Sequence, residues 1–150
     1  MKVREIIEFA INKEIEAIEF YKKLQNIAKL QSSKAFLKEL EEMEVSHKNI
    51  LQNYLDNPSE ISLIEQPTNL QISDFMDDVE AESDITFQQI LIIAMKREER
   101  AMSLYQQLAA QVEGEARNVF IRLSQEEAKH KLQLETIYDE EILKNFIKII

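Results

Sequence analysis

The stretch that decides the fold is AINKEIEAIEFY, residues 10–21, together with its near copy AMKREERAMSLY, residues 94–105. In both stretches alanine, glutamate, alanine and tyrosine fall at the same places, among apolar residues spaced three or four positions apart. That spacing is typical of one face of an α-helix that packs on a core. We therefore predict two helices in which Glu14 and Glu98 turn inward.

A second pair of similar segments extends the repeat. Glu44-Val-Ser-His47 stands in an apolar row with Leu37, Leu40 and Leu51, and Glu127-Ala-Lys-His130 stands in an equivalent row of Phe120, Leu123 and Leu134. Both rows have the helical spacing of three and four. The chain is thus predicted to be a duplicated helical hairpin in which the polar residues repeat as well.

The composition agrees with an all-α chain of one domain, residues 1–150. It holds one glycine, two prolines and 45% apolar residues, which leaves few residues for the turns of a sandwich or barrel. We predict four helices and a short C-terminal helix in an apolar tail, at residues 2–30, 33–55, 86–112, 115–138 and 140–150.

The ends and connections of these helices predict their arrangement. Ser32 or Ser33 is expected to cap the second helix, Thr86 and Gln89 to form a capping box on the third, and Gly114 to mark the turn into the fourth. Short turns predict two antiparallel hairpins, and residues 56–85, with a helical turn at 74–82, are long enough to cross a four-helix bundle. The apolar tail is expected to dock on the bundle or on a second subunit.

Charge and residue usage exclude several classes of function. The net charge of −10 argues against a nucleic-acid partner, and the absence of cysteine excludes disulfides, iron–sulfur clusters and thiolate chemistry. The first residues lack the apolar run of a signal peptide, and the longest apolar run, residues 90–95, is too short to span a bilayer. A soluble, cytoplasmic protein without a membrane partner is expected.

The repeated polar residues predict a dinuclear metal site. Four carboxylates facing one another in a core would repel, and each would cost several kcal/mol to bury unpaired. Two divalent cations remove both difficulties, and a Glu-x-x-His motif puts a carboxylate and an imidazole on one helical face. The predicted ligands, an oxygen and nitrogen set that suits iron or manganese with zinc as a substitute, are Glu14, Glu44, His47, Glu98, Glu127 and His130.

A plainer alternative must be weighed for each residue. A lone histidine on an apolar face is more often a hydrogen-bonded core residue than a ligand, but this chain has only two histidines and both follow a glutamate by three. Tyr21 and Tyr105 could be core aromatics, or they could hold a ligating carboxylate of the other repeat. We read Glu16, Glu19, Glu41, Glu42, Glu99 and Glu126 as surface charge, and Met43, Met95 and Met102 as core filler.

These motifs resemble the rubrerythrin-type branch of the ferritin-like diiron-carboxylate proteins. The resemblance rests on residues 14–21, 44–47, 98–105 and 127–130 and covers the four helices. It implies a ferritin-like bundle that holds two iron ions, with Glu44 and Glu127 as bridging ligands, Glu14 and Glu98 as terminal carboxylates and one histidine for each iron. No catalytic residue beyond this metal site is expected.

The sequence departs from the family pattern at several points. Many rubrerythrins carry a four-cysteine iron domain, whereas this chain has no cysteine, so a separate electron-donor protein is expected. Family members often have an exchanging glutamate three residues after the third-helix ligand, where this chain has Ala101. The chain also resembles bacterioferritin, but Val45 stands where the haem-binding methionine of that family would be, so no haem is expected.

Three functions follow as expectations. The first is a diiron oxidoreductase that reacts with hydrogen peroxide or dioxygen, as a peroxidase of rubrerythrin type. The second is a ferroxidase or iron-binding protein, and the third is a bundle in which the metal only stabilises the core. A homodimer is the expected assembly.

Overall fold

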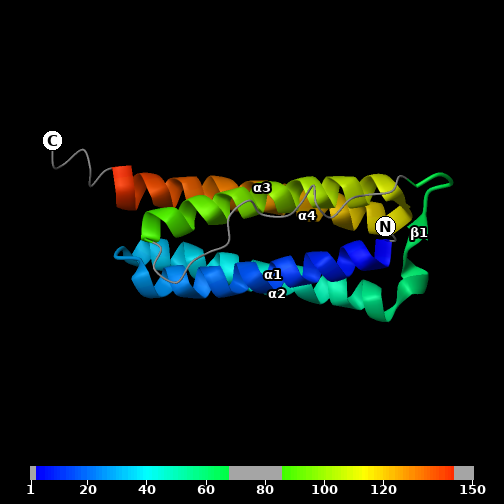
Figure 1. Cartoon of the computed structure of the whole chain (residues 1–150), viewed down its shortest axis with the longest axis horizontal. Coiled ribbons are helices and arrows are strands. Elements are labelled where there is room, and N and C mark those ends of the chain that lie inside the picture. The colour runs from blue at the N-terminus through cyan, green and yellow to red at the C-terminus, as the bar shows by residue number, and fades with distance from the viewer. Residues whose placement is uncertain (1–2, 68–85, 144–150) are drawn as a thin grey trace.

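The computed structural model describes residues 3–67 and 86–143. Four long helices form the molecule, namely α1 (Val3–Ile27), α2 (Gln31–Asp56), α3 (Phe87–Gln111) and α4 (Gly114–Tyr138). Helices α1 and α2 make one layer and α3 and α4 the other (Figure 1). The predicted all-α bundle of four helices is confirmed.

The chain direction requires one long crossover. Each layer is a pair of helices that run in opposite directions, and α2 ends at the end of the bundle opposite to the one where α3 begins (Figure 1). The connection between them must therefore cover the length of the bundle. Its first part contains a short 3-10 helix, η1 (Pro58–Glu60). The helical turn predicted at 74–82 lies outside the described residues.

A two-stranded ribbon, absent from the sequence prediction, ties the start of the crossover to the α3–α4 turn. Strand β1 (Ser62–Leu63) pairs antiparallel with β2 (Val112–Glu113). Directly after β2, Gly114 has a φ of 68°, a left-handed conformation that glycine adopts without steric cost. Strands of two residues are too short to show an alternating pattern.

The predicted helix caps had different outcomes. Thr86 and Gln89 form the expected capping box on α3. The prediction for α2 was wrong, because the helix begins at Gln31 and its N-terminus has no side-chain cap. In the α1–α2 turn just before this helix, Glu141 Oε1 accepts hydrogen bonds of 2.7 Å from the backbone N–H groups of Lys29 and Leu30.

That glutamate belongs to the end of the described chain. A turn of π-helix, η3 (Asp139–Leu143), continues α4 without a break and places the buried Glu141 against the α1–α2 turn. The predicted tail helix therefore starts as an extension of α4, and its remainder, residues 144–150, lies outside the described residues. Among the described residues, no helix is long and apolar enough to cross a bilayer.

The core consists of two apolar clusters at different levels of the bundle. The first lies at the end of the bundle where α1 begins, and we call it the N-end cluster. It includes Ile7, Ile11, Leu51, Leu108 and Phe120. The second, the C-end cluster, includes Tyr21, Leu24, Leu37, Leu91 and Leu134. Between the two levels the inward-facing positions are ionisable, and there the candidate site lies.

Candidate metal centre

The six residues predicted as ligands converge in the middle of the bundle. Glu14 comes from α1, Glu44 and His47 from α2, Glu98 from α3, and Glu127 and His130 from α4. Each is at most 2% exposed, which for carboxylates is rare unless they are paired or bind a cation. Each lies in a helical row with apolar residues on both sides, so the packing of those residues turns it inward.

The six residues form two overlapping groups of possible ligands. Ligand atoms of Glu14, Glu44, His47 and Glu127 lie within 4.8 Å of one another, and so do those of Glu44, Glu98, Glu127 and His130. Glu44 and Glu127 belong to both groups. The geometry thus offers two neighbouring positions that share two carboxylates, each with its own histidine and its own further glutamate.

Both histidines face the centre through Nδ1. His47 Nδ1 lies 2.6 Å from Glu127 Oε1, and His130 Nδ1 lies 2.8 Å from Glu44 Oε1, so each ring contacts a carboxylate of the opposite hairpin. The two rings are stacked, with centroids 5.7 Å apart and planes inclined by 14°. The centre therefore has the approximate twofold arrangement of the sequence repeat.

Three buried carboxylate oxygens test whether cations fit. Within the described part of the chain, Oε2 of Glu14, Glu44 and Glu98 accepts no hydrogen bond. These atoms lie 3.9 and 3.6 Å from His47 Nδ1 and 3.6 Å from His130 Nδ1, respectively. Two ligand atoms that bind the same ion, each at about 2.1 Å, can be up to about 4.2 Å apart. The residues therefore fit divalent cations, to which the unsatisfied oxygens would bind.

In the metal-free centre, protons balance the charge. Burial alone would raise the pKa of Glu44, but the hydrogen bond from His130 and the charges of the two histidines lower it to about 2. Burial would lower the pKa of His130, but Glu44 and Glu98 raise it to about 10. Burial and the charges of Glu44 and Glu98 raise the pKa of Glu127 well above its usual range. Cations that enter must therefore displace protons.

Two tyrosines hold the carboxylates that are not shared. Tyr21 on α1 donates a hydrogen bond to Glu98 on α3, and Tyr105 on α3 donates one of 2.6 Å to Glu14 on α1. Burial is the main cause that raises the pKa of both hydroxyls well above the usual range, so both keep their protons at neutral pH. Each tyrosine thus fixes one carboxylate of the other repeat.

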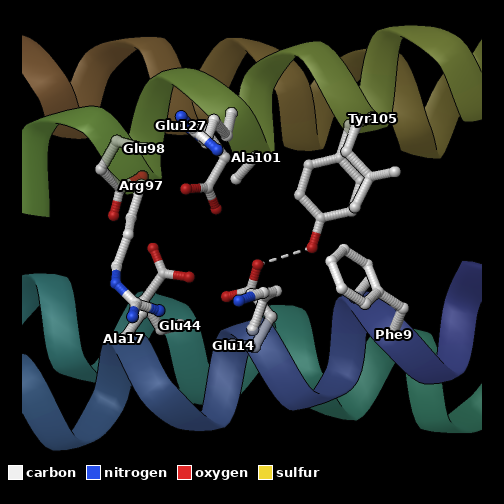
Figure 2. Close-up of a pocket in the computed structure, with 13 residues that line it drawn as sticks. Phe9, Glu14, Ala17, Glu44, Arg97, Glu98, Ala101, Tyr105 and Glu127 are labelled. Carbon is white, nitrogen blue, oxygen red and sulfur yellow. Dashed lines mark hydrogen bonds between the residues drawn. The ribbon is translucent and has the colours of Figure 1, made fainter. Parts of the chain in front are cut away.

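A small pocket between α1 and α3 reaches the centre. Figure 2 shows the carboxylates of Glu14, Glu44, Glu98 and Glu127 pointing into the space between the helices. We call this space, of about 30 Å³, the α1–α3 pocket. Its walls include the half-buried residues Ala17 and Ala101, together with Lys13, Arg97 and Arg100. That volume suits about two water molecules.

Some residues around the centre differ from their sequence interpretation. Glu16 is a surface charge as interpreted, with a side chain 44% exposed, but it also forms an ion pair with Arg97 of α3, whose guanidinium carbon lies 4.5 Å from the centroid of the Phe20 ring. Glu126, also expected on the surface, lies 2.5 Å from His47 Nε2. Met43 is not core filler, since it is 36% exposed. These contacts join different helices, and helical spacing within one segment contains no signal for them.

Known proteins are similar to the chain as follows. The family model described as Rubrerythrin matches residues 5–138, a range that includes all six converging residues. A solved structure of a hypothetical protein from Pyrococcus furiosus has a TM-score of 0.74 and 25% sequence identity, over 97% of this chain and 92% of that chain. No curated protein matches the chain.

Proposed function

Since the chain belongs to the rubrerythrin family, we propose that it is a non-haem diiron oxidoreductase that reacts with hydrogen peroxide or dioxygen. The observation that carries the proposal is the pair of overlapping ligand groups that share Glu44 and Glu127 inside the bundle. A purely structural cation would not need a second position beside it, nor a pocket that reaches it from solvent.

The six converging residues are the proposed ligands of two iron ions, for which manganese or zinc could substitute. When bound there as ferrous ions, the pair would supply two electrons, which with two protons suffice to reduce one molecule of hydrogen peroxide to two molecules of water. The four carboxylates would balance the four positive charges of the ions.

The protein's own groups have distinct parts in this proposal. Glu44 and Glu127 are within reach of both positions, so they can hold the two ions close together. Tyr21 and Tyr105 orient Glu98 and Glu14 through hydrogen bonds, and their hydroxyl protons lie at the edge of the centre. The tyrosines are therefore positioning residues.

The α1–α3 pocket favours a small uncharged substrate. Its volume of about 30 Å³ admits molecules of the size of peroxide or dioxygen. Lys13, Arg97 and Arg100 line it together with the carboxylates of Glu14, Glu44, Glu98 and Glu127, so the lining carries charges of both signs. A small neutral molecule such as peroxide fits this lining.

Ala101 sets a limit on the mechanism. It lines the α1–α3 pocket one helical turn after Glu98, and its methyl group cannot bind a metal. Because this position has no carboxylate, no ligand there can exchange with a histidine when the irons change oxidation state. We propose a centre with a fixed ligand set.

The remaining parts of the proposal concern partners. The 150 residues contain no cysteine, so we propose that the reducing electrons come from a donor protein that is separate from them. We also propose that the protein is a cytoplasmic homodimer. Size-exclusion chromatography with light scattering tests the assembly, and a cage-like oligomer would instead favour iron storage.

Stopped-flow spectroscopy tests the function. The protein is loaded anaerobically with two ferrous ions per chain and mixed with peroxide or with dioxygen at equal concentrations. We expect peroxide to oxidise the centre faster, and Ala101→Leu, which fills the α1–α3 pocket, to slow that reaction while two ions remain bound. Equal rates, or a faster reaction with dioxygen, would favour the ferroxidase. A centre that binds metal but is oxidised by neither would favour the structural role.

A further inference from the structure

The two halves of the centre differ at one residue outside the six. Glu126 directly precedes Glu127 on α4, and its side chain is 28% exposed. Its Oε2 lies 2.5 Å from Nε2 of His47, across the gap between α4 and α2. This carboxylate therefore contacts His47 directly, on the side of the imidazole ring that faces away from the centre.

The two nitrogens of His47 face opposite partners. Nδ1 points to the centre, 2.6 Å from Glu127 Oε1, whereas Nε2 points away from it to Glu126. With Nδ1 toward a cation, Nε2 carries the proton and donates it in a hydrogen bond to Glu126. A carboxylate in this position fixes the tautomer and orientation of a ligating imidazole and makes it a better ligand.

In the other half of the repeat, the position that corresponds to Glu126 does not carry a carboxylate. By the sequence repeat, Glu44 corresponds to Glu127, so the residue that corresponds to Glu126 is Met43. A thioether is only a weak hydrogen-bond acceptor. Within the described part of the chain, the recorded contacts of His130 with carboxylates are made through Nδ1, the nitrogen that faces the centre.

We infer that Glu126 is a positioning residue that makes the two ion positions unequal. The position formed by Glu14, Glu44, His47 and Glu127 binds its divalent cation first and more tightly. The position that contains His130 fills second. This inference rests on the proposed dinuclear centre, but it concerns the order and strength of binding, which that proposal leaves open.

A titration of the metal-free protein with Co²⁺, followed by calorimetry and by absorbance, tests the inference. We expect two steps in the wild-type chain. Glu126→Ala should weaken the first step by about 10–100-fold and leave the second unchanged, as expected for the loss of a partner behind a ligating histidine. The control is Glu135→Ala, which removes an equal charge from an exposed position of the same helix and should change neither step.

Met43→Glu supplies the complementary test, because it places a carboxylate at the exposed position that corresponds to Glu126 in the repeat. We expect it to strengthen the second step. His47→Ala and His130→Ala assign the steps, and they should abolish the first and the second, respectively. Circular dichroism checks that each variant is folded.

The outcomes separate this inference from the proposed function. If two Co²⁺ ions bind but Glu126→Ala weakens neither step, or weakens both equally, the inference is wrong and the dinuclear centre stands. An unchanged second step in folded Met43→Glu would also contradict it. If the wild-type chain binds fewer than two ions, the dinuclear proposal fails, and the inference with it.

Discussion

The apolar clusters and the polar centre occupy the same four helices but have opposite energetics. In the N-end cluster, side chains such as Leu108 and Phe120 are fully buried, and each contributes about 1.5–3 kcal/mol to folding. In the centre, buried carboxylates face one another, and each costs free energy unless a proton or a cation compensates it. The clusters can therefore hold the bundle together while the centre is kept ready for metal.

The largest expected effect is on the apolar side of this comparison. Leu108→Ala should lower the free energy of unfolding by about 2–5 kcal/mol, because it leaves a cavity in the N-end cluster. The loss should be the same with and without metal. Urea denaturation measures it, and Leu132→Ala is the matched control, since Leu132 is 63% exposed and its truncation should cost less than about 0.5 kcal/mol. A loss that vanished on metal binding would contradict the separation of clusters and centre.

Metal binding should sharpen the comparison from the polar side. A free cation concentration 100 times its dissociation constant should raise the free energy of unfolding by about 2.7 kcal/mol. Glu127→Gln should abolish this gain but change the metal-free stability little, because the raised pKa of Glu127 means that its carboxyl is already uncharged there. Thermal or urea unfolding with metal and with chelator measures both. A full gain in Glu127→Gln would show that the metal binds elsewhere.

The pH should act on the centre in opposite directions with and without metal. The pKa of His130 is about 10 in the folded metal-free chain and 6.5 in the reference state. Its contribution is therefore complete below about pH 6.5 and is lost as the pH rises toward 10. Titration of His130 alone should therefore cost the metal-free protein about 2 kcal/mol between pH 6.5 and 8. Glu127, whose pKa is also raised, acts in the same direction.

Metal affinity should instead increase over the same pH range, because cations compete with those protons. Urea denaturation with chelator at the two pH values, and metal titrations at both, measure the two trends. His130→Gln should flatten the metal-free trend. A metal-free protein that becomes more stable toward pH 8 would contradict the assigned proton balance.

The smallest expected effect concerns the hydrogen bonds around the centre. Tyr105→Phe removes the donor to Glu14 and should weaken metal binding about tenfold, which equals about 1.4 kcal/mol. Tyr54→Phe is the control, since Tyr54 belongs to the N-end cluster and lies outside the centre. Co²⁺ titration of both variants measures the difference. Equal affinities would assign Tyr105 to the core alone.

The sequence predicts those features that depend on spacing within one helix. Glu44 and His47 fall in an apolar row at helical spacing, so their inward direction could be inferred without coordinates. The helix bounds also lie within a few residues of the predicted ones, because the repeat and the capping box are local signals.

Contacts between distant residues could not be inferred in this way. The turn before α2 is bonded to Glu141, more than 100 residues away, and α2 begins at Gln31, so Ser32 and Ser33 were misleading as cap candidates. Glu126 on α4 contacts His47 on α2. The spacing of residues within α4 does not distinguish Glu126 from a glutamate at an exposed position of the same helix. The β1–β2 ribbon is formed by the meeting of two loops, which leaves no periodicity in either strand.

The most direct test of the account is a crystal structure of the iron-loaded protein with anomalous scattering recorded at the iron edge. The account predicts two anomalous peaks about 3.5–4 Å apart, one beside Nδ1 of His47 and one beside Nδ1 of His130, with Glu44 and Glu127 in contact with both. A single peak, peaks outside the six residues, or no peak in a crystal of protein loaded with two irons per chain would contradict it.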